Sequence, residues 1–324
     1  MSCKNPFILS LLFLFFSCGD DAFLQEAVRR TIEPSLPDQN RPGNIVIISG
    51  GTAALGTTPF PLHHIVLYTA EGSYIKTLYT AKNADRLWGG DVSPLERSFS
   101  FVVEGIDRVD SVDIDTTTVT NSILDPQLSG NTMRTLTYLR DGSMIIAESP
   151  TVLEKYNSSG IRVTTGFPLT IPTAIRSVRR ISGDRFIVTT TGNPDNPRVY
   201  SSSGVLLASF ANTAGCNTNC DPYEVVELPD GRFVASMQIA AKQSLELFES
   251  DFSYIGVLYR DLAVLPSPGS MDVLDNGDLI VCTLVLNACE QLRIDGNLAE
   301  RVGTRSLISE SSLIRQPTTV RVLP

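Results

Sequence analysis

The sequence predicts an all-β protein, a six-bladed β-propeller built from four-stranded antiparallel blades. Three observations lead to this prediction: a strand–turn–strand pattern recurs along the chain, its copies are evenly spaced, and the two ends of the repeated region complement each other. Asp-Gly and Asn-Gly turns between apolar segments are the strongest local signal for a β-hairpin, because glycine adopts positive φ without steric cost. Four strands in roughly 45 residues are typical of a propeller blade.

The recurring hairpin is the clearest repeat. Its glycine-containing copies lie at residues 138–146, 180–188, 227–234 and 273–281, and a copy without the glycine lies at 95–103. The first large apolar residues of the second strands are Phe101, Met144, Phe186, Phe233 and Leu279. They are 43, 42, 47 and 46 positions apart, so the chain contains structural units of one kind.

A second hairpin follows each first one. Its turns lie at residues 68–72, 156–160 and 200–204, and in altered forms at 115–118, 248–253 and 294–296. The two hairpins together supply four strands to each unit, which is the number that a propeller blade needs.

The first unit begins at Asn44 and lacks an innermost strand. Residues 317–324 align with 222–229, so we predict that the C-terminal segment supplies this strand and closes the ring. Residues 44–324, divided into six, give about 47 residues per blade, so one domain accounts for this whole region. A seven-bladed ring or another regular β-architecture is the alternative.

The pattern resembles the NHL, YVTN and gluconolactonase-like group of six-bladed propellers. The resemblance covers nearly all of the chain after the N-terminal segment, and hairpin spacing alone carries it, since the sequence has no WD or kelch signature. In the gluconolactonase-like family, a metal at the channel mouth is held by Glu, Asn and Asp and polarises a lactone carbonyl. No residues of this chain match those ligands one by one.

Residues 1–17 have the pattern of a secretory signal. The apolar run at 7–16 is too short to span a bilayer as a stable helix. Residues 14–18 resemble a bacterial lipobox and depart from it at Phe15, where the family usually carries Leu or another aliphatic residue. The resemblance implies that Cys18 becomes a lipidated N-terminus carrying several acyl chains, which anchor a protein stably. Ordinary secretion or an uncleaved anchor is the alternative.

The residues after Cys18 predict where the protein is placed. In the sorting rule of enteric bacteria, Asp after the lipidated cysteine retains a lipoprotein in the inner membrane, so Gly19 favours the outer membrane. Residues 18–43 are polar and contain three prolines, and we interpret them as a tether. The expected location is the bacterial cell envelope, on either the periplasmic or the surface side. A net charge of −9 argues against a nucleic-acid partner.

The remaining cysteines of the propeller region form two close pairs, Cys216 with Cys220 and Cys282 with Cys289. Two disulfides are expected for this count in an oxidising compartment. A metal site is the alternative for the first pair, although neither pair has C-x2-C spacing.

One rim of the predicted ring collects polar residues. Blade topology places the loops between second and third strands, and the loops between blades, on the rim where propellers usually bind their ligands. We predict that this rim carries the candidate ligand residues Glu104, Asp107, Glu148, Asp195, Gln238 and Asn287. Oxygen ligands of this kind could bind Ca²⁺, whereas the alternative is that they are solvated, and we predict no cofactor. Trp88 is the only tryptophan, so we expect no aromatic platform for sugars or bases.

These features predict a membrane-anchored lipoprotein whose propeller is a non-catalytic binding or assembly scaffold for a protein, peptide or glycan. The two histidines, His63 and His64, are adjacent and would point to opposite faces of a strand, so they cannot chelate one metal together. The first alternative is a metal-dependent hydrolase or lactonase with an acidic channel mouth. The second is a structural lipoprotein that spaces other envelope components.

Overall fold

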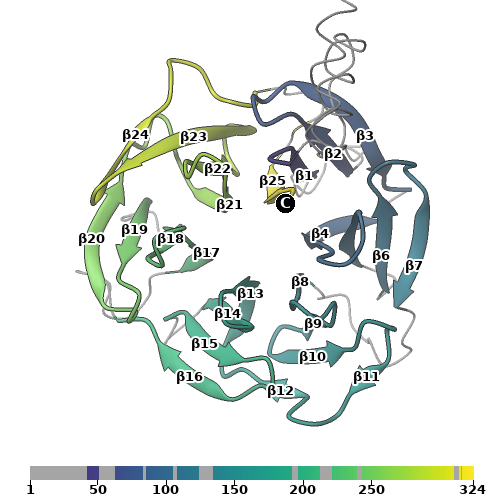
Figure 1. Ribbon diagram of the computed structural model, residues 1–324. Coiled ribbons are helices and arrows are strands. Elements are labelled where there is room, and N and C mark those ends of the chain that lie inside the picture. The colour runs from purple at the N-terminus through teal and green to yellow at the C-terminus, as the bar shows by residue number, and fades with distance from the viewer. Residues whose placement is uncertain are drawn as a thin grey trace, which may run out of the picture. The chain divides into compact units, whose positions relative to one another are not determined.

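The computed structural model describes residues 42–50, 63–82, 85–104, 108–123, 134–191, 196–211, 221–238, 243–309, 314 and 316–324. These residues form six antiparallel sheets that surround a common axis, so the predicted six-bladed propeller is confirmed (Figure 1). Within the described part of the chain, no helix has the length and apolarity that a membrane crossing needs. The predicted signal segment and the predicted tether, apart from residues 42 and 43, lie outside the described residues.

We name the blades A to F in chain order and give their strands from the axis outwards. Blade A contains β25 (Pro317–Val322), β1 (Ile45–Ser49), β2 (His64–Tyr68) and β3 (Tyr74–Thr80). Blade B contains β4 (Arg86–Val92), β5 (Ser98–Glu104), β6 (Arg108–Asp113) and β7 (Val119–Ile123). Blade C contains β8 (Leu136–Tyr138), β9 (Met144–Ser149), β10 (Val152–Tyr156), β11 (Arg162–Val163) and the short β12 (Leu169–Thr170), which also pairs with β10.

The other three blades have four strands each. Blade D contains β13 (Ala174–Ile181), β14 (Arg185–Thr191), β15 (Arg198–Ser201) and β16 (Leu206–Ser209). Blade E contains β17 (Pro222–Glu227), β18 (Phe233–Met237), β19 (Ser244–Phe248) and β20 (Tyr254–Tyr259). Blade F contains β21 (Pro268–Val273), β22 (Leu279–Thr283), β23 (Ala288–Asp295) and β24 (Leu298–Arg301).

The C-terminal strand closes the ring as predicted. Strand β25 pairs antiparallel with β1, from Ile45 opposite Val322 to Ile48 opposite Thr319. Two backbone hydrogen bonds extend this pairing, from the Gly43 N–H to the Leu323 carbonyl at 2.8 Å and from the Leu323 N–H to the Asn44 carbonyl at 2.7 Å. The first blade is therefore assembled from both ends of the propeller sequence.

Apolar side chains fill the spaces between neighbouring blades. Six clusters of buried side chains occur among the described residues, and each one spans two adjacent blades. Ile65 and Phe99 belong to the cluster between blades A and B, and Tyr68 and Ile280 to the one between A and F. Because burial of apolar surface is the main force in folding, packing across the A–F junction holds the ring closed together with the β25–β1 pairing.

The hairpins between first and second strands have the predicted glycine turns. Gly142, Gly231 and Gly277 have φ values of 79°, 87° and 84°, which a residue with a side chain rarely adopts. We call the end of the ring that carries these turns the lower end. The upper end carries the connections between second and third strands and between successive blades.

Candidate binding site at the upper end of the propeller axis

A network of polar side chains lies on the propeller axis, with one member from the innermost strand of each blade. The members are Arg321 (β25), Asp91 (β4), Thr137 (β8), Arg179 (β13), Glu224 (β17) and Asp272 (β21), and we call them the axial network. Arg321 Nη2 lies 2.8 Å from Glu224 Oε1, and Arg321 Nε lies 3.5 Å from Asp91 Oδ1. One arginine from the C-terminal strand thus pairs with carboxylates of two other blades.

The second arginine completes the network. Arg179 donates a short hydrogen bond to Asp272, and its Nη1 lies 3.9 Å from Glu224 Oε1. The Thr137 hydroxyl donates to Asp91 Oδ2 at 2.8 Å, which brings blade C into the network. The six blades are therefore connected by polar contacts at the axis as well as by apolar packing between them.

The carboxylates of the network also bind backbone N–H groups of the next blade. The Tyr138 N–H donates to Asp91 Oδ2 at 3.0 Å, and the Val322 N–H donates to Asp272 Oδ2 at 2.8 Å. An innermost strand has one edge without a strand partner, and buried N–H groups at such an edge need an acceptor. The network supplies acceptors to these strand edges.

The axial network contains two arginines and three carboxylates, and its most buried ion pair joins Arg321 to Glu224. The Arg321 and Glu224 side chains are 3% and 2% exposed. Burial alone would lower the pKa of Arg179, but Asp272, Glu224 and Asp91 raise it above its usual value. Ion pairs of this kind are costly to break, because one charge then stays buried without a partner. The network is therefore equipped to hold the blades together.

The upper halves of the innermost strands contain β-bulges. In five of these strands the pairing register shifts near the upper end. The residues passed over in the pairing are Trp88 and Gly89 in β4, Arg176 in β13, Tyr223 and Glu224 in β17, Gly269 and Ser270 in β21, and Thr318 in β25. A bulge bends its strand and changes the direction of a side chain.

Most of the bulged residues line a cavity of about 70 Å³, which we call the upper cavity. Two guanidinium groups of its lining lie over aromatic rings. The Arg134 guanidinium carbon is 5.5 Å from the centre of the Trp88 ring, and the Arg176 guanidinium carbon is 5.5 Å from the centre of the Tyr223 ring. Arginine and aromatic side chains in such pairs are common in recognition surfaces.

Gly89 allows the first of these pairs to form. A Cβ atom at Gly89 would lie 2.6 Å from the Thr135 Cα and 2.7 Å from the Arg134 carbonyl oxygen. The Gly89 N–H donates to that same carbonyl at 2.8 Å. The absence of a side chain lets β4 approach the segment before β8, and this approach brings Arg134 to Trp88.

The upper cavity is locally positive in an acidic protein. Its charged lining residues are Arg134, Arg176, Arg321 and Glu224. Arg321 pairs with Glu224, and Arg176 Nη2 lies 2.7 Å from Asp221 Oδ1. Arg134 is exposed and forms no ion pair with any carboxylate among the described residues.

Three buried polar atoms of the lining residues lack a hydrogen-bond partner among the described residues: Thr318 Oγ1, Arg176 Nε and Arg321 Nε, of which Arg321 Nε still lies 3.5 Å from Asp91 Oδ1. Thr318 is only 7% exposed, so water cannot fully replace the missing partner of its hydroxyl. The Tyr223 hydroxyl donates to the Thr318 carbonyl at 3.1 Å. Burial raises the pKa of Tyr223 to about 12, so this hydroxyl remains a neutral donor.

The predicted rim residues Glu104 and Glu148 lie near the upper ends of β5 and β9. Glu104 Oε2 accepts a hydrogen bond from Trp88 Nε1 at 2.6 Å and lies 3.8 Å from the Arg86 guanidinium. Glu104 therefore positions the tryptophan of the upper cavity.

Gln238 and Asn287 also lie at the upper end, after β18 and in the connection from β22 to β23. Gln238 Nε2 donates to the Pro268 carbonyl at 3.3 Å, and Asn287 Oδ1 accepts from the Gln316 N–H at 2.8 Å. Both side chains thus bind backbone of adjoining blades. Within the described residues, no three His, Cys, Asp or Glu side chains are placed to hold a metal ion together. The other two rim residues, Asp107 and Asp195, lie outside the described residues.

The predicted disulfide between Cys282 and Cys289 is confirmed. It joins directly opposed residues of β22 and β23, and both cysteines are fully buried. The loop that it closes carries Val285 and Leu286, which are 64% and 47% exposed. The bond therefore fixes an exposed apolar tip at the upper end. Cys18, Cys216 and Cys220 lie outside the described residues.

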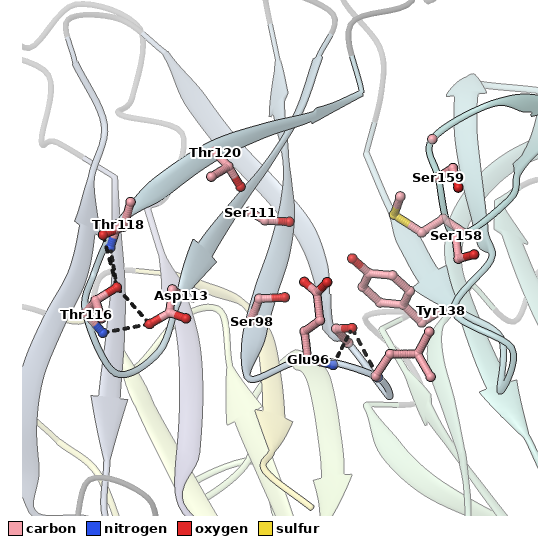
Figure 2. A pocket seen from close by; sticks show the side chains of 15 residues that line it. Glu96, Ser98, Ser111, Asp113, Thr116, Thr118, Thr120, Tyr138, Ser158 and Ser159 are labelled. Carbon is pink, nitrogen blue, oxygen red and sulfur yellow. Dashed lines mark hydrogen bonds between the residues drawn. The ribbon is translucent and has the colours of Figure 1, made fainter.

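Two larger cavities, of about 560 Å³ each, lie at the lower end. Figure 2 shows the one between blades B and C, where Ser, Thr and Tyr hydroxyls gather around Glu96 and Asp113. Asp113 accepts hydrogen bonds from the Thr116 N–H and hydroxyl at 2.7 and 2.8 Å. In the other cavity, on the axis, Glu227 accepts from the Ser182 hydroxyl at 2.6 Å. These polar groups at the lower end thus form hydrogen bonds with residues of the turns.

The residues of the upper cavity and of the axial network were not among the predicted site residues, although the sequence contains a signal for them. When the innermost strands are aligned at their lower ends, with Ser93 matched to Leu139, Leu228 and Leu274, one position is occupied by Trp88, Arg134, Arg176, Tyr223 and Thr318, and by Gly269 in blade F. Asp91, Thr137, Arg179, Asp272 and Arg321 occupy another, three residues later. Polar or aromatic residues that recur at one repeat position of the innermost strands must face the axis together.

No protein-family model matches the sequence, and curated proteins give no match. The fold is similar to a chain in the crystal structure of a nidogen/laminin complex, with a TM-score of 0.64 and 10% identity over 87% of this chain and 99% of that chain. It is also similar to virginiamycin B lyase from Staphylococcus aureus, with a TM-score of 0.57 and 10% identity over 87% and 89% of the two chains. A protein of unknown function from Bacteroides caccae has a TM-score of 0.57 and 13% identity, over 86% and 98%. At these identities the likeness shows the fold alone.

Proposed function

We propose that this protein is a lipid-anchored protein of the bacterial cell envelope whose propeller binds a protein, peptide or glycan partner at its upper end without catalysing a reaction. One observation carries the proposal. The charged groups on the axis are engaged with one another, and the cavity above them is lined by two guanidinium–aromatic pairs and by polar atoms that have no hydrogen-bond partner among the described residues.

The fold alone does not choose between binding and catalysis. The similar chains include one from a nidogen/laminin complex and a lyase, so the fold occurs both in a protein assembly and in an enzyme. The chemistry of the upper cavity favours binding. Arginine and aromatic side chains recognise groups on a partner, and arginine stays protonated and cannot serve as a general base.

The disulfide loop supports the same end of the ring as the contact surface. Val285 and Leu286 are exposed at its tip, and the Cys282–Cys289 bond restricts the loop in the free protein. Apolar side chains held in place before binding lose less conformational entropy when a partner covers them. The upper end thus combines an apolar projection with a polar recess.

Membrane attachment rests on the lipobox-like residues 14–18, and Cys18→Ser removes the only thiol that the lipid could modify there. We expect this variant to move from the membrane fraction to the soluble fraction of lysed cells. Continued attachment of Cys18→Ser to membranes would contradict the lipoprotein assignment.

Paired photocrosslinking in intact cells tests the binding end. Val285 at the upper end and Ile161 at the lower end are 64% and 63% exposed, so a photoreactive residue at either position is equally accessible. We expect a reproducible covalent adduct from position 285 and none from position 161. Equal adducts from both positions, or an adduct from 161 alone, would place the contact surface elsewhere.

Chelation separates binding from the metal-dependent alternative. We expect the unfolding temperature of the purified protein to be the same with and without a strong chelator. A clear fall in that temperature, reversed by added Ca²⁺, would favour the hydrolase or lactonase instead.

A further inference from the structure

We propose that the upper cavity binds a carboxylate group of a peptide or protein partner, either a free C-terminus or an acidic side chain. This inference rests on the proposed function, because it names the chemical group that the partner presents to the upper end. It is carried by the charge of the cavity, by its unpartnered donors and by its size.

Charge is the first argument. Three arginines and one glutamate are the charged side chains that line the upper cavity. Glu224 is already engaged by Arg321 at 2.8 Å, while Arg134 has no carboxylate partner among the described residues. A guanidinium over the face of an aromatic ring does not use its N–H groups in that contact, so they can donate to a planar carboxylate.

The unpartnered polar atoms are the second argument, and they are independent of the charge count. Arg176 contacts both Asp221 oxygens through Nη2 alone, at 2.7 and 2.9 Å, so this ion pair leaves Nε unused. Arg176 Nε and Thr318 Oγ1 are both buried and have no partner among the described residues. A guanidinium N–H can only donate, so the missing group must be an acceptor such as a carboxylate oxygen.

Size is the third argument. A cavity of about 70 Å³ can receive a carboxylate but not the body of a folded partner. The axial network forms its floor, since Arg321 and Glu224 line it from below. The ligand group must therefore enter from the upper end as the tip of a side chain or of a chain terminus.

Two pairs of peptides test the carboxylate directly. Acetyl-triglycine as a free acid is compared with its C-terminal amide, and acetyl-Gly-Glu-Gly-amide with acetyl-Gly-Gln-Gly-amide. Binding to the full-length protein in mild detergent is measured by ligand-observed NMR titration. We expect at least one acid to bind roughly tenfold more tightly than its neutral partner, as a charge-assisted hydrogen bond allows. The pair in which the acid binds more tightly than its neutral partner shows whether the carboxylate comes from a C-terminus or from an acidic side chain.

Variants locate the site. Arg134→Gln removes the exposed guanidinium, and we expect roughly tenfold weaker binding of the responding acid. Thr318→Val keeps the side-chain shape and removes the hydroxyl, with an expected loss of about threefold. Arg140→Gln is the matched control, because Arg140 is also exposed but lies at the lower end.

Three results would overturn the proposal. They are equal binding of acid and amide in both pairs, equal affinities of Arg134→Gln and Arg140→Gln, and tighter binding of inorganic phosphate than of either acid at this site. The proposed function fails separately, when the photocrosslinker at position 285 gives no adduct. If position 285 gives adducts but the acid peptides bind no more tightly than their amides, the proposed binding function is supported and the proposed carboxylate ligand is wrong.

Discussion

The two halves of each innermost strand are built differently. In the lower halves the register is regular, the hairpins turn at Gly142, Gly231 and Gly277, and carboxylates accept N–H groups of the next blade. In five of the six upper halves the register is broken by a bulge, and some polar atoms at the cavity have no hydrogen-bond partner within the part of the chain that the structure describes. The buried ion pairs that join the blades therefore lie at the axis, whereas the polar groups available to a partner lie above them.

The largest expected effect comes from breaking the axial network. Arg179→Met leaves Asp272 buried without its cation, and we expect a loss of roughly 3–5 kcal/mol in the free energy of unfolding. The neighbouring Arg180→Met is the control, because Arg180 is exposed and we expect a change of at most about 0.5 kcal/mol. Urea unfolding of the two variants measures both values, and similar values would refute a supporting role for the axis.

The upper end has its own stabilising devices, and His63 is one of them. Burial lowers the pKa of His63 to about 4, and its Nδ1 accepts a hydrogen bond from the Leu87 N–H at 3.1 Å. Because the folded protein disfavours the protonated ring, its contribution is complete above pH 6.5 and is lost as the pH falls towards 4. The loss amounts to roughly 3 kcal/mol.

His63→Gln isolates this contribution, since glutamine keeps an acceptor and does not titrate. We expect the free energy of unfolding of the wild type to fall more steeply than that of His63→Gln between pH 6.5 and 4. His64, whose pKa burial also lowers, is present in both proteins and cancels in the difference. Parallel curves would show that His63 does not couple the upper end to pH.

The disulfide at the upper end has a smaller expected effect. Cys282 and Cys289 are seven positions apart, and closing so short a loop restricts the unfolded chain by only about 2 kcal/mol. The double variant Cys282→Ala/Cys289→Ala should lose about this amount in guanidinium unfolding without reductant. A loss as large as that of Arg179→Met would mean that the upper end holds the ring as firmly as the axis.

Much of the fold could be predicted from the sequence because its signals are local and repeated. The glycine turns and the spacing of the hairpins gave six blades, and the alignment of residues 317–324 with 222–229 gave the closing strand. The Cys282–Cys289 bond was predicted from the close spacing of two cysteines, on the expectation of an oxidising compartment. Each of these inferences needs only residues that are close in the sequence or that occupy equivalent positions in two repeats.

The candidate site could be predicted only in part, because its contacts join residues that are remote in the sequence. The topology predicts an upper-end position for Glu104, but the hydrogen bond from Trp88 to Glu104 depends on the register of β4 and β5. Trp88, expected to stand alone, lines a cavity together with Tyr223 of blade E. Arg179 and Asp272 are 93 residues apart and meet only because the blades converge on one axis.

The claim that a partner binds at the upper end and not at the lower end is tested most directly by hydrogen exchange. Exchange is compared with and without the acid peptide that binds more tightly than its neutral partner. Mass spectrometry of the full-length protein follows upper segments around residues 88–89, 134–135, 176–177 and 318–319, and lower turns at 140–142 and 182–184. We predict slower exchange in the upper segments when the acid is bound, and unchanged exchange in the lower turns. Protection of the lower turns, or of both ends alike, would contradict the assignment of binding to the upper end.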